Sequence, residues 1–275
     1  DRSPSRGLGD VYKRQEYLQA KENPNTEKVI LQLHGGGYVG AMRNAYRMFA
    51  GLYCEVSHGM SVLTPDYRVA PEHPYPAALE DAYAAYCYLL EQGWFSEQII
   101  IAGDSAGGGL AMALCHYLKD HGKQLPCGIV AMSPWTDLTI SGESVETNFE
   151  KDPLFGKTRD SMLYNKDYLG ENDPTNEYIS PLFGDYEGFP PLLIQVGSYE
   201  MLLSDSTRVA KKAKEAGGKV KLSIYEGMFH VFQMAMLLMP ESKKAWAEIK
   251  RFLHYLDAEE KEENEMQNIS KEEKA

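Results

Sequence analysis

Residues 103–107 read Gly-Asp-Ser-Ala-Gly, with Ser105 at the centre. The apolar residues 99–102 before this motif suit a buried strand, and residues 110–117 after it form helix readily. A sharp turn between the two would expose the Ser105 hydroxyl, and glycines on either side allow strand and helix to approach closely. The pattern predicts a nucleophile elbow. A glycine-rich turn with an incidental serine is the alternative that these five residues alone leave open.

Three consecutive glycines, Gly35 to Gly37, follow His34 and the apolar residues 29–33. Glycines leave backbone N–H groups unobstructed, and such donors stabilise negative charge that develops only in a transition state. The loop therefore predicts an oxyanion hole. A phosphate-binding loop would need the spacing G-x-x-x-x-G-K-[ST] or G-x-G-x-x-G, and this segment has neither.

His230 stands in a loop after the strand-like residues 220–225, late in the chain. The general base lies at this place in hydrolases whose catalytic residues run in the order serine, acid, histidine. A lone histidine is more often structural, but this one completes a set with Ser105 and the glycine loop. We expect His230 to act as the base.

Together these motifs resemble the hormone-sensitive-lipase family of α/β-hydrolase esterases. The similar segments are 34–37 (HGGG), 66–77 (DYRVAPEHPYPA), 103–108 (GDSAGG), 133–138 (SPWTDL) and Phe229-His230. They occur in the family's order and extend over about residues 16–256. The resemblance implies a serine esterase with Ser105 as nucleophile and His230 as base. It also implies that the backbone N–H groups of Gly36, Gly37 and Ala106 form the oxyanion hole, and that no cofactor is needed.

The third catalytic residue departs from the family's commonest pattern, in which Asp-Pro-Leu-x-Asp follows the penultimate strand. Here residues 192–196 lead into Gly-Ser-Tyr-Glu, ending at Glu200, with Asp205 further on. Aligned on the strand end, Glu200 takes the place of the family's aspartate, and a glutamate can orient an imidazole with one more methylene of reach. We expect Glu200 to be the acid. Asp205 is the alternative acid, although we expect it instead to cap the helix that begins at Ser206.

Several nearby polar residues are expected to support the site without taking part in the chemistry. Asp104 should point away from Ser105 and brace the elbow, and His34 should orient the glycine loop. Loop-bracing roles are expected for Glu72, His73 and Asp137. Asp152 begins an Asp-Pro-Leu segment like the family's acid motif, but it precedes the strand where the acid belongs. No pair of His, Asp or Glu residues has metal-ligand spacing on a helix or strand pattern, so no metal site is predicted.

The composition fits a globular protein. Hydrophobic residues make up 43% of the chain, which is enough for a sizeable core. The formal charge is −12, of which residues 257–275 contribute −5, and no basic patch indicates a nucleic-acid partner. No apolar run approaches the length of a membrane span, and no secretion signal is recognised. The four cysteines lack paired or C-x-x-C spacing. We therefore expect a cytoplasmic protein. The resemblance implies that its partner is a small-molecule ester, and homo-oligomers are left open.

Apolar runs alternate with helical patterns along the chain. Strands are expected near residues 28–33, 61–65, 98–102, 128–133, 192–197 and 219–225, and helices near 45–57, 77–92, 106–121, 205–216 and 241–256. This alternation predicts an α/β fold with a mainly parallel central sheet and helices on both faces. Residues 137–190 interrupt it and are too long for a plain crossover. We expect them to form a partial lid over the carboxyl ends of the strands.

The α/β-hydrolase domain is expected to span residues 16–256. Residues 1–15 are rich in Arg, Ser and Gly, lack periodicity and are expected to be a non-native leader. Because members of the family usually carry a first strand and lid helices before this point, we expect a truncated copy with an open sheet edge near residues 16–20. Residues 257–275 are expected to form an acidic tail, either disordered or a frayed extension of the last helix.

These expectations describe a serine carboxylesterase that acts on small esters with short acyl chains through an acyl-enzyme. Two alternatives remain at this point. One is an amidase or acyltransferase that uses the same three residues. The other is a catalytically silent receptor for small ligands on the same fold. Such receptors are recognised by loss of the base, and His230 is present.

Overall fold

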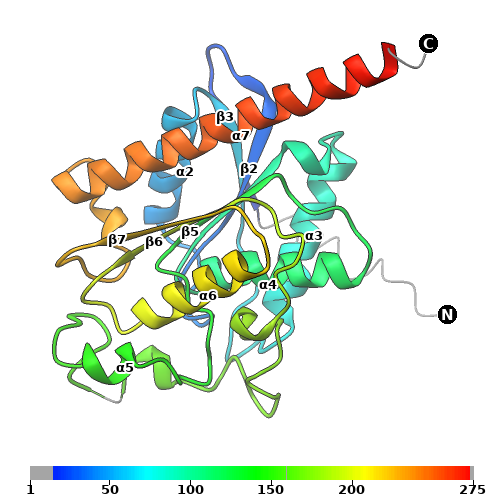
Figure 1. Ribbon diagram of the computed structural model, residues 1–275. Coiled ribbons are helices and arrows are strands. Elements are labelled where there is room, and N and C mark those ends of the chain that lie inside the picture. The colour runs from blue at the N-terminus through cyan, green and yellow to red at the C-terminus, as the bar shows by residue number, and fades with distance from the viewer. Residues whose placement is uncertain (1–14, 159, 273–275) are drawn as a thin grey trace.

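A β-sheet forms the centre of the structure (Figure 1). The computed structural model describes residues 15–158 and 160–272, with side chains up to residue 257. Within these residues seven strands lie in the order β1-β3-β2-β4-β5-β6-β7. Their bounds are β1 Gln15–Leu18, β2 Asn25–Leu33, β3 Met60–Pro65, β4 Ile99–Asp104, β5 Gly128–Met132, β6 Leu192–Gly197 and β7 Val220–Tyr225. β1 pairs antiparallel with β3, and each of the other neighbouring pairs is parallel.

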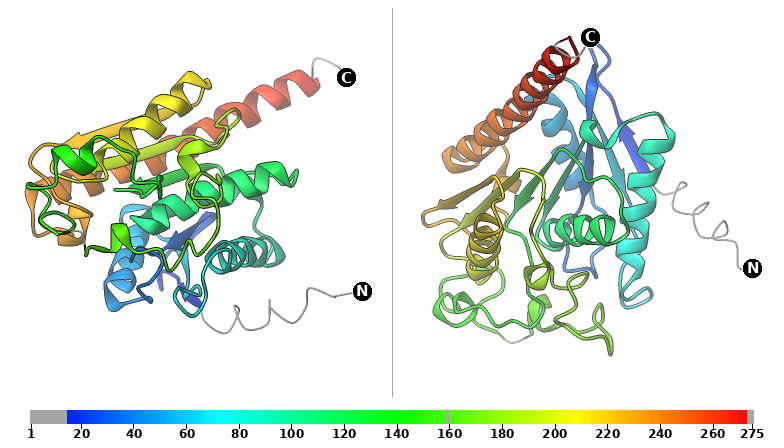
Figure 2. Two further views of the ribbon diagram at one scale, coloured as in Figure 1. Left: turned by 90° about the horizontal axis from the view of Figure 1, so that it is seen from below. Right: turned by 45° about the vertical axis from the view of Figure 1, so that its right-hand side comes forward.

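Helices alternate with these strands along the chain (Figure 2). The α-helices are α2 Asn44–Val56, α3 Ala77–Glu91, α4 Ala106–Asp120, α5 Ser144–Thr147, α6 Leu203–Glu215 and α7 Pro240–Glu272. Short 3₁₀ helices are η1 Ser96–Gln98, η2 Met162–Tyr164, η3 Pro181–Phe183 and η4 Phe232–Ala235. No helix in the described ranges is both long and apolar enough to cross a membrane.

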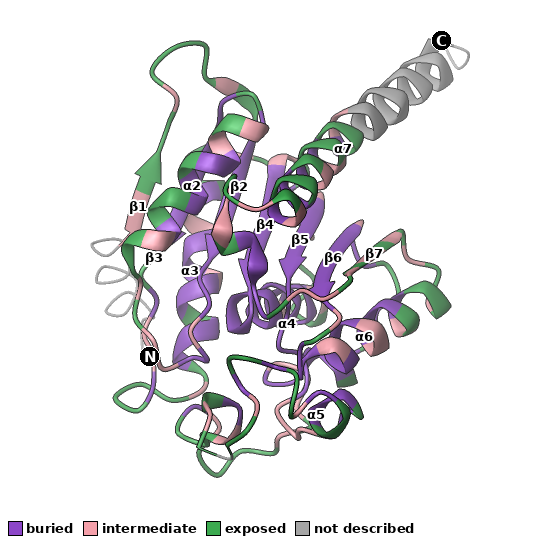
Figure 3. Ribbon diagram, turned by 90° about the vertical axis from the view of Figure 1, so that its left-hand side faces the viewer, coloured by how far each residue is buried: buried purple, intermediate pink, exposed green. Residues whose placement is uncertain are grey.

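The helices cover both faces of the sheet (Figure 3). Val29 and Leu31 of β2 pack in one core with α3, α4 and α6, whereas Ile30 between them packs in a second core with α2 and α7. Every residue of β3, β4, β5 and β6 is buried. A parallel sheet that is covered on both faces needs apolar residues at successive positions, which explains the continuous apolar runs in the sequence.

The carboxyl ends of the parallel strands meet at one edge of the sheet. The loop after β2 carries Gly36 and Gly37, Ser105 follows β4, Glu200 follows β6, and His230 follows β7. Ligands and catalytic groups of open α/β sheets gather at this edge, because that is where the strands deliver their loops.

Residues 137–190, between β5 and β6, contain α5, η2 and η3. They pack onto this same edge. The Tyr168 ring stacks on Tyr38 with 3.8 Å between centroids, and the Tyr168 carbonyl accepts the Tyr75 N–H at 2.9 Å. The segment thus lies against the loops that follow β2 and β3, where the sequence predicts a lid.

The expected strands and helices agree with the observed ones to within three residues, apart from the two ends of the chain. Gln15, which falls within the expected leader, begins β1 and pairs with Pro65 at the outer edge of the sheet. The other residues of that leader, 1–14, lie outside the described residues. At the other end, α7 continues to Glu272 through most of the acidic tail. Glu, Lys, Met and Gln are good helix formers, which accounts for this continuation.

Candidate active site

Ser105 lies at the turn between β4 and α4, with φ 52° and ψ −123°. Positive φ is unusual for a residue other than glycine and marks a strained turn. A Cβ on Gly103 would lie 2.3 Å from the Gly107 carbonyl oxygen, and a Cβ on Gly107 would lie 2.1 Å from the Leu33 carbonyl oxygen. Both positions therefore require glycine, as the sequence predicts for a nucleophile elbow.

Ser105, His230 and Glu200 come from three separate loops and form a continuous chain of contacts. His230 Nε2 lies 2.9 Å from Ser105 Oγ, and His230 Nδ1 lies 2.8 Å from Glu200 Oε2. The three residues are 5%, 6% and 0% exposed, respectively. Burial strengthens each polar contact, because water does not compete for it.

The Glu200 carboxylate accepts hydrogen bonds from other groups besides His230. Its Oε1 accepts the Gly197 N–H at 2.5 Å and the Ser133 hydroxyl at 2.7 Å. The same Ser133 hydroxyl accepts the Val231 N–H at 3.1 Å, one residue beyond His230. Sequence reasoning assigned Ser133 no role. The available signal was its place directly after β5, next to the end of β6, at the start of the Ser-Pro-Trp segment.

Asp205 lies in the first turn of α6 but does not cap that helix. The capping position is Leu202, and no side chain there hydrogen-bonds the helix end. Instead, Asp205 Oδ2 accepts the N–H groups of Thr136 and Asp137 at 2.7 and 2.9 Å. The predicted helix cap is therefore wrong, because loop 136–137 lies nearer to the carboxylate. Burial raises the pKa of Asp205 to about 7, and the neighbouring Asp137 carboxylate adds to this effect.

The glycine loop turns sharply and leaves two donors open. Gly36 has φ 117° and Gly37 φ 63°, and the Gly36 carbonyl accepts the N–H groups of Val39 and Gly40. In the described part of the chain no hydrogen bond uses the N–H of Gly36 or Gly37. Ala106 is the first residue of α4, so its N–H has no partner within the helix. Such donors, with the positive end of a helix dipole, suit a developing negative charge.

Asp104 and His34 support the glycine loop. Asp104 Oδ1 accepts the Gly35 N–H at 3.2 Å, and burial raises the pKa of this carboxyl group to about 7. The His34 ring stacks on Tyr67 at 4.0 Å, and the Tyr67 hydroxyl donates to the His34 carbonyl at 2.5 Å. The contacts of His34 agree with its expected role of orienting the glycine loop. Asp104 was expected to brace the elbow, and its carboxylate joins the elbow to the glycine loop.

The 144–152 part of the lid region is tied to the loop of Glu200. The Asn148 side-chain amide donates to the Glu200 carbonyl at 2.8 Å, and Asp152 Oδ2 accepts the Met201 N–H at 2.8 Å. The Ser144 hydroxyl donates to the Met201 carbonyl at 2.6 Å. Asp152 is therefore an anchor of this segment, consistent with its rejection as the catalytic acid.

Further along the same segment, two side chains reach the reacting groups. The Phe155 ring lies 4.6 Å from the His230 ring between centroids. A Cβ on Gly37 would lie 2.8 Å from Met162 Sδ, so the thioether packs directly against the glycine loop. The lid region therefore narrows the space around Ser105 from two sides.

Of the remaining polar residues, Asp137 is a buried brace, as expected. Its carboxylate accepts hydrogen bonds from Thr139, Ser141 and Arg208, the last at 2.6 Å. Glu72 and His73 are exposed, on the loop between two cis prolyl bonds. Among the described residues no group of three or more His, Cys, Asp or Glu side chains could hold a metal ion.

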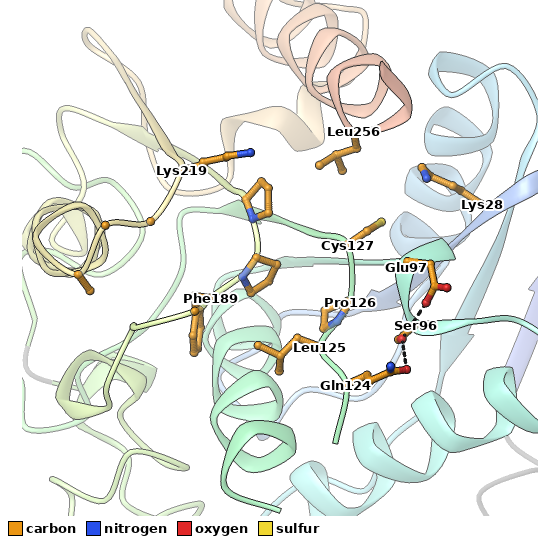
Figure 4. A pocket seen from close by; sticks show the side chains of 16 residues that line it. Lys28, Ser96, Glu97, Gln124, Leu125, Pro126, Cys127, Phe189, Lys219 and Leu256 are labelled. Atoms are coloured by element: carbon orange, nitrogen blue, oxygen red, sulfur yellow. Dashed lines mark hydrogen bonds between the residues drawn. The ribbon is translucent and has the colours of Figure 1, made fainter. Parts of the chain in front are cut away.

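A cavity of about 550 Å³ lies at the opposite edge of the sheet (Figure 4). Its lining includes Ser96, Gln124, Pro191 and Lys219, which precede β4, β5, β6 and β7, respectively. It therefore opens at the amino ends of the strands and has no part in the arrangement around Ser105.

The fold and this site define a class of protein, and comparison with known proteins agrees with it. Residues 30–234 match the family described as having the alpha/beta hydrolase fold. The chain belongs to this α/β-hydrolase family. It is 39% identical over 240 residues to an esterase of Acinetobacter venetianus, covering 87% of this chain and 78% of that protein. It is 40% identical to an acetyl-hydrolase of Streptomyces hygroscopicus over 218 residues, or 79% and 72% of the two chains.

Solved structures place the chain among the bacterial members. An esterase from the bacterial hormone-sensitive lipase family superposes with a TM-score of 0.81 at 37% identity, over 90% of this chain and 88% of that one. The esterase EstE5, in crystals soaked with p-nitrophenyl butyrate, gives the same TM-score and identity over 90% and 86% of the two chains. The resemblance to the hormone-sensitive-lipase family is thereby confirmed.

Proposed function

We propose that this protein is a serine carboxylesterase in which Ser105 is the nucleophile, His230 the base and Glu200 the acid. Ser105 Oγ bonds to the ester carbonyl carbon while its proton passes to His230 Nε2. The carbonyl oxygen becomes an oxyanion, which accepts hydrogen bonds from the N–H groups of Gly36, Gly37 and Ala106. Throughout, the His230 Nδ1–H donates to Glu200 and so keeps the ring in the working tautomer.

The intermediate collapses when His230 gives its proton to the departing alkoxide. The bond between carbonyl carbon and alcohol oxygen breaks, the alcohol leaves, and the acyl group stays on Ser105. Water then attacks the acyl-enzyme by the same route: His230 takes a proton from the water and returns it to Ser105 as the carboxylic acid departs. No cofactor takes part in this sequence.

The observation that carries the proposal is the buried chain of contacts from Ser105 Oγ through both nitrogens of His230 to Glu200 Oε2, at 2.9 and 2.8 Å. The unused N–H groups of Gly36 and Gly37 belong to the loop after β2. The start of this loop packs against Gly107, two residues after Ser105. A silent ligand receptor does not need a base aligned on a strained serine, so this geometry favours an enzyme.

Small esters with short acyl chains are the substrates that fit best. Phe155 and Met162 pack against His230 and Gly37, so little room is left for a long acyl chain beside the reacting atoms. Two relatives support this substrate class: the Streptomyces protein is named an acetyl-hydrolase, and EstE5 was soaked with a butyrate ester. The cytoplasmic location expected from the sequence stays a prediction, and the oligomeric state stays open.

A fluorophosphonate probe and a series of p-nitrophenyl esters test the proposal. The probe should label the parent and the control Ser61→Ala, which removes a buried hydroxyl of β3, but not Ser105→Ala. Ester turnover should fall by several orders of magnitude in Ser105→Ala alone. The value of kcat/KM should be higher for C4 than for C12 esters, and higher for esters than for the matching anilides. Labelling that persists in Ser105→Ala would contradict the assignment of the nucleophile.

A further inference from the structure

A glutamate at the acid position has more conformational freedom than the aspartate that is usual there. Its side chain has one more rotatable bond than that of aspartate, so the carboxylate can adopt more positions relative to the histidine. An acid that orients an imidazole must nevertheless stay fixed to within about half an ångström. Something in the structure must therefore restrict Glu200 to the conformer in which Oε2 faces His230.

Ser133 meets this need through its contacts. Its hydroxyl donates to Glu200 Oε1 at 2.7 Å, on the oxygen that does not touch His230. Gly197 N–H donates to that same oxygen at 2.5 Å, so Oε1 is bound from two directions. With Oε1 fixed, the position of Oε2 follows from the carboxylate geometry.

The same hydroxyl also fixes the chain that carries His230. It accepts the Val231 N–H at 3.1 Å, and Val231 has φ 50°, a conformation that a β-branched residue adopts only when its surroundings impose it. Ser133 itself has φ 47° and is fully buried, and its N–H donates to the Gln195 carbonyl at 2.6 Å. One hydroxyl thus joins the ends of β5 and β6 to the loop after β7.

We propose that Ser133 is a positioning residue for catalysis, which holds the carboxylate of Glu200 and the backbone beside His230 in register with each other. The inference rests on the proposed function, in which Glu200 orients His230. Ser133 touches neither the ester nor the reacting atoms and acts only through these two residues. Without its hydroxyl, Glu200 Oε1 keeps the Gly197 N–H alone, and the Val231 N–H loses its acceptor.

Two substitutions remove the hydroxyl with opposite effects on the backbone. Ser133→Ala keeps a Cβ at positive φ, whereas Ser133→Gly suits that φ and so separates the loss of the hydroxyl from strain. The matched control is Ser57→Ala. Ser57 is also buried, donates to the Cys54 carbonyl and accepts the Met60 N–H, but it lies at the end of α2, away from the site. Each variant is prepared alone and together with Glu200→Gln.

Because the lost bond involves a carboxylate, both Ser133 variants should lose about tenfold in kcat for p-nitrophenyl butyrate, with KM within about twofold of the parent. In the Glu200→Gln background the same substitutions should change kcat by less than about twofold, because the carboxylate that Ser133 positions is gone. Ser57→Ala should match the parent.

Full activity of Ser133→Gly would overturn the inference. So would an equal loss in the presence and absence of the Glu200 carboxylate, since a merely structural serine would produce that result. If Glu200→Gln alone kept full activity, Glu200 would not be the acid, and the failure would lie in the proposed function on which this inference rests.

Discussion

Exchanging Glu200 for Gln replaces one carboxylate oxygen with an NH₂ group and leaves the shape of the side chain nearly unchanged. The remaining oxygen can still accept the Gly197 N–H and the Ser133 hydroxyl, at the 2.5 and 2.7 Å seen for Oε1. The amide N–H₂ then faces His230 Nδ1, which can only accept from it. The ring proton must therefore sit on Nε2, which can no longer take the proton of Ser105.

The wrong tautomer in a serine hydrolase costs about 10⁴ in kcat, which corresponds to about 5.5 kcal/mol of transition-state stabilisation. We expect a loss of this size for Glu200→Gln with p-nitrophenyl acetate near pH 8. The urea unfolding midpoint should stay close to that of the parent, because the hydrogen bonds to Oε1 survive. Labelling by a fluorophosphonate should slow by a similar factor, since it uses the same activated Ser105.

Asp205→Asn is the matched comparison, because Asp205 is the other acid that sequence reasoning left open. A single oxygen, Oδ2, accepts both N–H groups of Thr136 and Asp137, and an asparagine oxygen can do the same. Its kcat should stay within about threefold of the parent, as for other residues that do not touch the reacting groups. A Glu200→Gln loss of less than tenfold, or a larger loss in Asp205→Asn, would refute the reasoning.

Three further outcomes are expected. Gly107→Ala should lower the free energy of unfolding by about 1–3 kcal/mol, because the new Cβ would lie 2.1 Å from the Leu33 carbonyl oxygen. Urea unfolding measures this change, and an unchanged midpoint would contradict it. The buried Asp205, whose pKa is raised to about 7, keeps a proton that the unfolded chain releases near pH 4. Its contribution to stability is therefore lost as the pH rises through about 7, and unfolding free energies at pH 5 and pH 7.5 should differ less in Asp205→Asn than in the parent. Met162→Ala should raise the C8-to-C4 ratio of kcat/KM by up to about tenfold, because the thioether fills the space against Gly37; a constant ratio would exclude this role.

The sheet was predictable because its strands are buried on both faces and carry continuous apolar runs, as in residues 99–102. The strand order and the antiparallel β1 were not. Pairing of β1 with β3 joins Gln15 to Pro65 across fifty positions of sequence, and no local pattern records it. The end of α7 was left open between a disordered tail and a helical extension, because the apolar stripe that marks its buried face ends near Leu256 while helix-favouring polar residues continue.

At the site, Ser105 and His230 were predictable because each stands beside a glycine-marked turn at the end of a strand. Glu200 was predictable from its distance to the strand end alone. The contacts of Asp205 and Ser133 were not, because their partners lie in loops 67 to 98 residues away along the chain. Local reasoning about a helix start assigned Asp205 to its own helix, whereas the fold brings loop 136–137 closer.

The ties between residues 144–152 and the loop of Glu200 make one end of the lid region a fixed hinge. An outward swing of this end would pull the backbone carbonyl of Glu200 through Asn148 and disturb its hold on His230. Further along the lid region, Met162 touches the glycine loop through a flexible thioether and is 37% exposed. We therefore expect ester to enter and alcohol to leave past Met162. In each turnover the lid region would then open beside the oxyanion hole while Glu200 stays in place.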